Sequence, residues 1–368
     1  MNNYANDPRI ILTLDAGGTN SIFSAIKGGE EIVTPVHKPS KTDTLDGCLA
    51  VLKEGFSEVI DCLPERPSAI SFAFPGPADY ARGIIGDLPN LPAFRGGVPL
   101  GAILEDEFRM PVFINNDGNL YAYGEALVGV LPAINRRLEA MGSNKKYRNL
   151  IGVTLGTGFG CGIVADGRLL AGDNSAEGEI WCMRNKKYPE MIVEESVSIR
   201  AVKRVYTELT GDTTDLTPKD IFDIAEGIRP GDAQAACRSF AELGEMAGDA
   251  LSAAVTLIDG VVAVGGGLAG ASKYIVPAMV AEMNSNLGMF AGNRFPRIIS
   301  RVYNLDDEAA WQEFARGAEV EITVPGSGRK QVYDAMKRVG VMTTSQSTSH
   351  LVVMGAYTYA LSRLDVAE

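Results

Sequence analysis

The sequence is poor in the residues that build metal and disulfide sites. It has only two histidines, His37 and His350, and five scattered cysteines without Cys-x-x-Cys spacing. A structural zinc site needs Cys and His ligands grouped at short spacings, so we expect no zinc site. An odd number of isolated cysteines is typical of free thiols in a reducing compartment, which predicts a cytoplasmic protein.

Basic charge and long apolar runs are also scarce. Lys and Arg number 34 against 46 Asp and Glu, a formal net charge of −12. An acidic surface repels phosphate backbones and anionic lipid, so we expect no nucleic-acid partner and no membrane partner. The stretch 251–271 approaches the roughly 20 residues of a membrane helix. However, Asp259 and the glycines 265–267 interrupt it, and a buried helix followed by a buried strand fits better.

A chain of 368 residues favours two domains, at roughly 100–200 residues each. Each half opens with a strand, a glycine-rich turn and a second strand, which suggests two related α/β lobes. The first such unit is 10–26 and the second is 150–165. Apolar periodicity predicts further strands at 69–74, 112–115 and 261–264, and helices at 44–62, 98–108, 119–128, 198–210, 217–226 and 232–257.

The first glycine turn is Asp15-Ala16-Gly17-Gly18-Thr19-Asn20. Glycines after a strand let backbone N–H groups approach an anion closely. Asp15 is placed to hold a hydrated Mg²⁺ and Thr19 to donate to a phosphate. The alternative is a tight hairpin that Asp15 caps.

The second glycine turn, Gly156–Gly162, also suits phosphates. It is neither a dinucleotide-binding fingerprint nor a Walker A loop, because no helix follows directly and no Gly-Lys-Ser/Thr closes it. Close strand packing is the alternative. A third run, Gly265-Gly266-Gly267, follows a buried strand and leaves room for a base and ribose, or serves helix–strand packing.

Two acidic motifs complete the set. Asp117 follows a strand within Asn115-Asn116-Asp117-Gly118-Asn119. It can accept a proton from a hydroxyl nucleophile, while Asn116 orients a sugar; the alternative is that Asp117 caps the next helix. In the run 176–182, Glu179 can accept sugar hydroxyls, and Trp181 can pack on a sugar or lie in the core.

Taken together, these segments resemble the ROK family of repressors and kinases, whose fold is similar to hexokinase and actin. The resemblance covers about residues 10–271 and 350–364. Its most specific part is the ordered pattern Pro75-Gly76-Pro77, Gly83, Asn90-Leu91-Pro92, Asn116-Asp117-Gly118-Asn119 and Gly124-Glu125.

The resemblance implies an α/β, two-lobed actin-like ATPase (ribonuclease H-like) fold, each lobe a mixed sheet flanked by helices. A small lobe, 1–125, would be completed by a C-terminal helix, 350–368. A large lobe, 126–349, would bind the nucleotide. Its extended segment, 323–341, is a departure from the family and has no counterpart there; we expect it to be a surface loop and helix, a dimer element or a lid.

The resemblance also implies ATP and Mg²⁺, a homodimer, and phosphorylation of a hexose or N-acetylhexosamine at the 6-hydroxyl. Asp117 would be the catalytic base. The sugar would be held by Gly76, Asn90, Asn116, Glu179 and Glu194. The transferred phosphate and the metal would be served by Asp15, through water, and by Gly17, Gly18 and Thr19. The other phosphates would lie at Gly156, Thr157, Gly158 and Gly160, and adenosine at Gly266 and Gly267.

The chain departs from the family where members usually read Glu-x-Gly-His. That His touches the sugar and binds zinc together with cysteines that follow it. Here the motif is Glu179-Ile180-Trp181-Cys182, and 183–193 contains no cysteine. A catalytically weak sugar-binding regulator on the same fold is therefore the rival to a kinase. A DNA-binding repressor is disfavoured, because only nine residues precede Ile10 and the net charge is −12.

Overall fold

The computed structural model describes residues 4–16, 20–39, 44–88 and 91–367. The chain forms two compact units. The first unit consists of Met1–Gly129, Gly162–Gly178 and Gln346–Glu368, and the second of Val130–Cys161 and Glu179–Ser345. The predicted lobes, 1–125 with 350–368 and 126–349, remain a prediction, and the compact units differ from them mainly in the segment 162–178.

The first unit is built on a mixed sheet in the order β3-β2-β1-β5-β8, with β4 also paired to β2. β1 and β2 are antiparallel, whereas β1, β5 and β8 run parallel. The strands are β1 (Ile11–Ala16), β2 (Asn20–Lys27), β3 (Glu30–Glu31), β4 (Val36–Pro39), β5 (Ala69–Ala73) and β8 (Val112–Asn115). A small ribbon, β6 (Ala78–Asp79) with β7 (Ile84–Ile85), lies outside this sheet.

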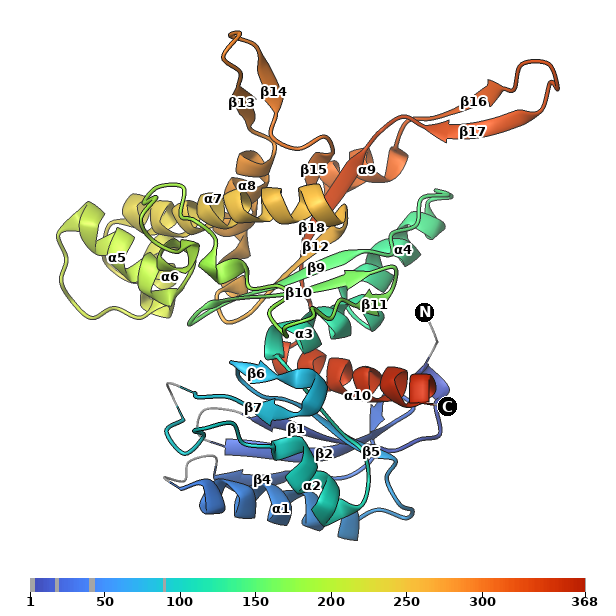
Figure 1. Cartoon of the computed structure of the whole chain (residues 1–368). Helices are drawn as coiled ribbons and strands as arrows, with labels where there is room; N and C mark the ends of the chain where they lie inside the picture. The colour runs from blue at the N-terminus through green and yellow to red at the C-terminus, as the bar shows by residue number, and fades with distance from the viewer. Residues whose placement is uncertain (1–3, 17–19, 40–43, 89–90, 368) are drawn as a thin grey trace. The chain divides into compact units, whose positions relative to one another are not determined.

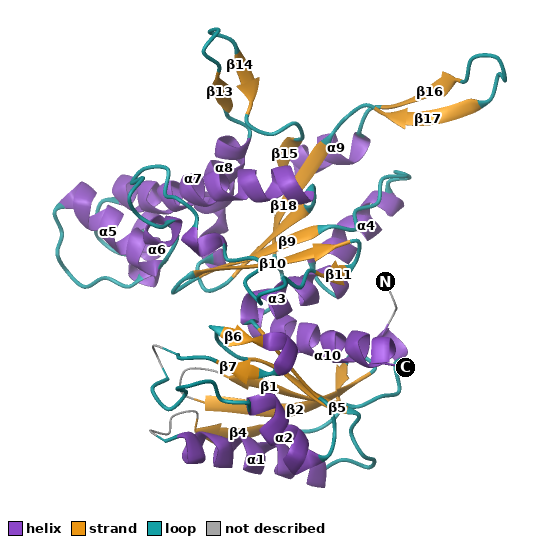
Figure 2. Cartoon of the chain, viewed as in Figure 1, coloured by secondary structure: helices purple, strands orange, loops and turns teal. Residues whose placement is uncertain are grey.

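Helices cover this sheet on both faces (Figure 2). They are α1 (Leu45–Asp61), α2 (Leu100–Phe108), α3 (Asp117–Leu127) and α10 (Thr348–Ala367). α1 contacts β2 and β4, whereas α10 contacts β1, β5 and β8. α1 is amphipathic, so Leu52, Phe56 and Val59 face the core.

The helices α3 and α10 touch backbone to backbone. A methyl group added at Gly355 would come within 1.9 Å of the Leu120 carbonyl oxygen, and one at Gly124 within 2.1 Å of the Leu351 carbonyl oxygen. Glycine is therefore required at both crossing points, and the helix from the far end of the sequence becomes part of the first unit.

The second sheet repeats the plan of the first, in the order β11-β10-β9-β12-β18-β15. β9, β12, β18 and β15 run parallel, as β1, β5 and β8 do. The strands are β9 (Leu150–Leu155), β10 (Phe159–Ala165), β11 (Arg168–Leu169), β12 (Val261–Gly265), β15 (Arg301–Asn304) and β18 (Arg338–Thr343). β11, and β10 from Gly162 onward, count with the first unit.

The helices of the second unit are α4 (Val130–Ala140), α5 (Ile199–Thr210), α6 (Pro218–Ala225), α7 (Ala233–Ile258), α8 (Ser272–Met283) and α9 (Glu308–Arg316). The long α7 packs closely on α8, where a methyl group at Gly244 would meet the Ile275 carbonyl oxygen at 2.2 Å. Two ribbons extend from this unit: β13 (Asn286–Gly288) with β14 (Arg294–Pro296), and β16 (Glu319–Thr323) with β17 (Lys330–Asp334) (Figure 1).

The expected strands and helices are present, with shifts of a few residues at their ends. For the segment 323–341, the alternative of a surface loop and helix was wrong, because the segment contains no helix. Its first part belongs to the ribbon β16–β17 and its last part to the buried strand β18. The alternatives of a dimer element and a lid stay predictions. Along the described part of the chain, no helix combines the length and the apolar character that crossing a membrane requires.

Candidate functional site

Asp117 is the first residue of α3, directly after the parallel strand β8. The expectation that Asp117 might cap the helix was wrong, because the cap is Asn116, whose Oδ1 accepts a hydrogen bond from the Gly118 N–H at 2.8 Å. The Asp117 side chain is exposed and accepts from the same N–H at 2.9 Å. Because this carboxylate is exposed, it can accept a hydrogen bond and then a proton from a hydroxyl group that binds beside it.

Asn116 and the turn at Gly76 meet through a buried tyrosine. The Tyr80 hydroxyl donates to the Phe74 carbonyl oxygen at 2.9 Å and lies 3.5 Å from the Asn116 Nδ2. A methyl group at Gly76 would lie 3.2 Å from the same hydroxyl. The structure therefore brings Gly76, Asn116 and Asp117 together at one end of the first sheet. The carbonyl oxygen of Asn116 accepts the helix-cap hydrogen bond, and one of its amide N–H groups donates to the Tyr80 hydroxyl. The second N–H of the amide remains for a ligand.

A buried network supports the start of α3. The Asn119 Nδ2 donates to Asn115 at 3.0 Å and to the Glu177 Oε1 at 2.7 Å. The other Glu177 oxygen accepts from the Gly172 N–H at 3.0 Å. Glu177 thereby fastens the loop 170–178 to the helix that carries Asp117.

In the second unit, Glu179 lies just before a short helical turn, Ile180–Cys182. The Trp181 indole N–H donates to the Glu179 carboxylate, and the Cys182 thiol donates to the Glu179 carbonyl oxygen at 3.0 Å. Trp181 is 38% exposed, so it is not a core residue. Burial, together with the charge of Glu179, raises the pKa of the Cys161 thiol to about 12.

The second glycine turn is narrower than predicted. β9 ends at Leu155 and β10 begins at Phe159, so the turn is Gly156–Gly158 and Gly160 lies within a strand. A methyl group at Gly160 would meet the Thr154 Oγ1 at 2.4 Å, so close strand packing explains this glycine. Gly156, Thr157 and Gly158 remain the candidates for a phosphate-binding turn.

Glu194 lies against this turn. Its carboxylate accepts from the Phe159 N–H at 3.0 Å and from Arg200 at 3.3 Å. A methyl group at Gly158 would come within 2.6 Å of the Glu194 Oε2. Arg200 also reaches Glu195 at 2.7 Å and the Thr157 carbonyl oxygen at 3.4 Å. Glu194 therefore braces the glycine turn, and Arg200 brings a positive charge beside it.

The third glycine run lies next to the second. A methyl group at Gly156 would be 3.9 Å from the Gly267 backbone nitrogen. Gly266 has φ +90°, and a methyl group there would come within 2.4 Å of the Leu155 carbonyl oxygen. A methyl group at Gly267 would meet nothing within 4 Å. Gly266 is thus required by the backbone, whereas Gly267 borders open space that a ligand can fill.

The first glycine turn is described only in part. Asp15 lies near the end of β1, opposite Ile22 of β2, and is half-buried. Gly17, Gly18 and Thr19, and also Asn90 of the predicted sugar site, lie outside the described residues. Within the described ranges, no group of three or more His, Cys, Asp or Glu side chains is arranged to hold a metal ion.

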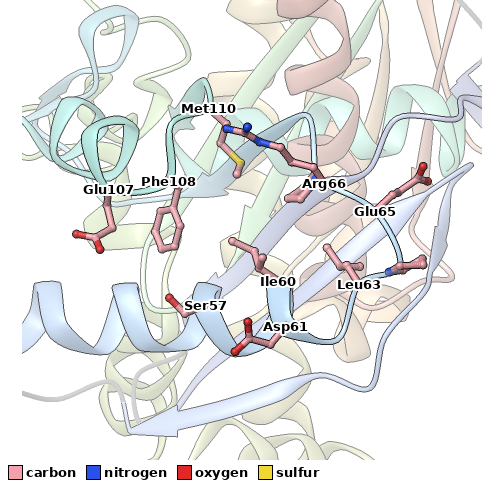
Figure 3. A pocket seen from close by; sticks show the side chains of 11 residues that line it. Ser57, Ile60, Asp61, Leu63, Glu65, Arg66, Glu107, Phe108 and Met110 are labelled. Atoms are coloured by element: carbon pink, nitrogen blue, oxygen red, sulfur yellow. The ribbon is translucent and has the colours of Figure 1, made fainter.

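A cavity of about 520 Å³ lies elsewhere in the first unit (Figure 3). It is lined by side chains from the end of α1, the segment that follows α1 and the end of α2, among them Ile60, Leu63 and Phe108. None of the predicted site residues lines it. We therefore assign the site from the strand ends and the glycine turns rather than from cavity size.

Sequence reasoning missed four residues that shape these groups: Tyr80, Asn119, Glu177 and Arg200. Asn119 lies in the motif 115–119 and Glu177 in the run 176–182, so their polar side chains within these motifs could have indicated a role in the site. Tyr80 and Arg200 lie outside any motif, and only the folded chain places them beside Asn116 and Thr157.

Comparisons with known proteins point to one family. The model of the ROK family matches residues 11–311. The crystal structure of a glucokinase from Parabacteroides distasonis is 61% identical, covers 98% of this chain and 99% of its own, and superimposes with a TM-score of 0.91. This match confirms the predicted α/β fold.

Curated relatives match over shorter stretches. An N-acetyl-D-glucosamine kinase of Vibrio cholerae is 30% identical over 170 residues, which are 46% of this chain and 51% of that protein. A glucokinase of Halalkalibacterium halodurans is 32% identical over 177 residues, 45% of this chain and 47% of that protein. The chain spans about half the length of these curated relatives.

Proposed function

The chain belongs to the ROK family, and from that premise we propose that it is an ATP-dependent sugar kinase. Its substrate is a hexose or N-acetylhexosamine, phosphorylated at the 6-hydroxyl. The relative with 61% identity over nearly the whole chain is a glucokinase, and curated relatives act on glucose or N-acetylglucosamine by name. These names support a sugar kinase more than a catalytically weak regulator.

One observation carries the proposal: an exposed carboxylate, Asp117, stands at the N-terminus of α3 beside amide groups that suit a sugar. A sugar hydroxyl is a weak nucleophile, and a carboxylate within about 2.6–3.2 Å accepts its proton as it attacks phosphorus. Phosphoryl transfer otherwise requires positioning and charge neutralisation rather than covalent chemistry. Asp117 is therefore the catalytic base.

The sugar is bound by side chains with unused donors and acceptors. Asn116 offers one amide N–H group, because its oxygen caps α3 and its other N–H donates to the Tyr80 hydroxyl. Glu179 offers a carboxylate held by the Trp181 indole N–H. Gly76 supports the turn beside Asn116, and Asn90 stays a predicted contact. Glu194 acts indirectly, by bracing the turn Gly156–Gly158.

The glycine turns fit a nucleotide. The turn Gly156–Gly158 presents backbone groups of the kind that hold phosphates. Arg200, which pairs with Glu194 and Glu195, donates to the Thr157 carbonyl oxygen and so helps to hold this turn in place. The open space at Gly267 suits the adenosine, next to Gly156. Gly17, Gly18 and Thr19 are predicted to hold the transferred phosphate.

A magnesium ion fits the same proposal. Mg²⁺ usually keeps several waters and binds through one or two carboxylates and the substrate phosphates, so it needs no cluster of protein ligands. Asp15 is the residue that would hold it, through water, and the ion would neutralise phosphate charge. A homodimer in the cytoplasm completes the proposal, on the resemblance to the family.

The first test is ADP release with Mg²⁺-ATP and a panel of sugars: glucose, mannose, fructose, N-acetylglucosamine and N-acetylmannosamine. Wild type should turn over at least one of them. Asp117→Asn should lower kcat about 10²–10⁴-fold, the usual contribution of a positioned general base. ATP binding, measured by calorimetry, should be unchanged.

Asp106→Asn is the matched control, since Asp106 is a strongly exposed carboxylate in the same unit. It should retain wild-type turnover. Wild-type turnover in Asp117→Asn would refute the assignment of the base. No turnover of any sugar by wild type, with sugar binding intact, would instead favour the regulator.

A further inference from the structure

Two ribbons of the second unit expose large apolar side chains to solvent. The short ribbon is β13–β14 with its turn, 286–296, and the long ribbon is β16–β17 with its turn, 319–334. Both extend away from the sheet and helices of their unit (Figure 1). A two-stranded hairpin by itself is at best marginally stable in water, so each ribbon needs a further stabilising contact.

The long ribbon has one apolar face and one charged face. Val320 lies opposite Tyr333, and Ile322 opposite Gln331. Directly opposite residues of an antiparallel pair point to the same side, so these four share a face. The other face consists mainly of polar and charged residues: Glu319, Glu321, Thr323, Lys330 and Asp334, with Val332 among them. The charged face, with its Lys330–Glu321 ion pair at 3.0 Å, suits solvent.

The short ribbon repeats this arrangement. Leu287 lies opposite Phe295, and Met289 follows on the same side. Phe290, in the turn, is 115% exposed. Arg294 lies on the opposite face, and the segment 286–296 contains no acidic residue. The short ribbon is thus an apolar surface with positive charge on an acidic chain.

We propose that these two ribbons are the surface through which a second copy of this chain binds. Seven apolar side chains form the two faces and the tip, and each is about half exposed or more: Leu287, Met289, Phe290, Phe295, Val320, Ile322 and Tyr333. An aromatic side chain alone presents roughly 150–250 Å². The seven together leave on the order of 800 Å² uncovered, the area that each partner buries in a standard interface.

Area and supply both point to a second copy. The exposed area of the seven side chains matches what one partner contributes to a standard interface. Every molecule of this protein exposes the two ribbons, so a partner that covers them must be present in equal amount. A second copy of the chain always meets this condition. Two-fold symmetry would let each copy contribute both ribbons, which doubles the contact. The proposal specifies the surface of the homodimer and does not depend on kinase activity.

The test compares neighbouring residues on opposite faces of β16. Ile322→Asp places a charge on the apolar face, and Thr323→Asp places the same charge on the polar face. Sedimentation equilibrium should give wild type and Thr323→Asp twice the chain mass of 39.2 kDa. Ile322→Asp should weaken self-association at least tenfold. Phe295→Asp should act in the same direction through the short ribbon.

Circular dichroism and thermal unfolding will show whether each variant is folded. A wild-type protein that is monomeric at tens of micromolar would overturn the proposal. The proposal would also be overturned if folded Ile322→Asp and folded Phe295→Asp dimerised as tightly as wild type. Binding of a monomeric wild type to phosphatidylcholine–phosphatidylserine vesicles would also overturn it, since the ribbons would then meet lipid.

Discussion

At the scale of single residues, Trp181 is the least expected member of the proposed sugar site. The family resemblance places Gly and His where this chain has Trp181 and Cys182. In the structure, the indole N–H holds the Glu179 carboxylate, and the Cys182 thiol holds the Glu179 backbone oxygen. We infer that Trp181 positions Glu179 for the sugar, a task that the sequence alone did not reveal.

Trp181→Phe should keep the ring and remove the donor. We expect the KM for the sugar to rise about fivefold, which corresponds to the roughly 1 kcal/mol of one hydrogen bond. The KM for ATP should not change. Trp311→Phe, at a fully buried position, is the control and should affect thermal stability rather than the sugar KM.

The same pair of residues offers a direct readout. The chain has two tryptophans, so Trp311→Phe leaves Trp181 as the sole indole fluorophore. Addition of the sugar should change its emission in this variant, without any turnover. An unchanged spectrum at saturating sugar, or an unaltered sugar KM in Trp181→Phe, would show that Trp181 has no part in the site.

At the scale of elements, the sequence predicted the central strands well, because buried strands leave strong local patterns. The second glycine turn is shorter than predicted, and most of the first lies outside the described residues. It failed on β18, which begins with Arg338. A charged residue reads as surface, yet Arg338 is 3% exposed, paired with Asp334 and placed over the Phe314 ring. Asp334 is only four residues away, but the burial of the pair and the contact with the distant Phe314 cannot be predicted from local spacing.

The glycine turns were predicted as groups, and the structure separates their members. Gly160 and Gly266 are explained by close backbone or side-chain neighbours, whereas Gly267 has none within 4 Å. The sequence contains the same residue type at all three positions. Only the positions of Thr154 and Leu155 distinguish a glycine needed for packing from one that leaves room for a ligand.

This difference can be tested with two neighbouring substitutions. Gly267→Ala adds a methyl group in open space, so the melting temperature should stay near wild type while the KM for ATP rises about tenfold, or about 1.4 kcal/mol. Gly266→Ala forces alanine into positive φ against Leu155 and should lower stability by about 1–3 kcal/mol. If Gly267→Ala bound ATP with wild-type affinity, the adenosine would not bind at this glycine run.

At the scale of the whole molecule, the two ends of the sequence are joined within the first unit. Arg9 forms ion pairs with Asp7 at 2.7 Å and with Asp365 of α10 at 2.8 Å. The Tyr4 hydroxyl donates to the same Asp365 at 2.8 Å. Each of these partly exposed ion pairs adds little to the free energy of unfolding. Together they fasten α10 to the segment 4–9, which leads into β1.

This junction predicts a pH dependence. The hydrogen bond from Arg9 lowers the pKa of Asp7 below its ordinary value, against an opposing effect of burial. A carboxyl with a lowered folded-state pKa stabilises the fold fully above its unfolded pKa, about 3.9, and loses that effect as the pH falls through the folded value. Asp7→Asn should therefore cost about 1 kcal/mol at pH 7 and less below pH 4.

Urea unfolding of wild type and Asp7→Asn at pH 7, 5 and 3 measures this difference. Asp106→Asn is again a control, because its carboxylate is strongly exposed. A difference between wild type and Asp7→Asn that stays constant over the whole range would mean that the Arg9 pair does not stabilise the junction through charge.

The close crossing of α3 and α10 has a consequence for synthesis on the ribosome. Residues 346–368 complete the first unit but follow the whole second unit in the chain. Translation adds roughly 5–20 residues per second, so the nascent β1–β8 sheet waits on the order of ten seconds or more for the helix that covers one of its faces. The second unit can fold during that interval. The first unit can be completed only after that interval, when α10 has been synthesised. Until then one face of its sheet stays uncovered, and we expect chaperones to bind this face in the cell.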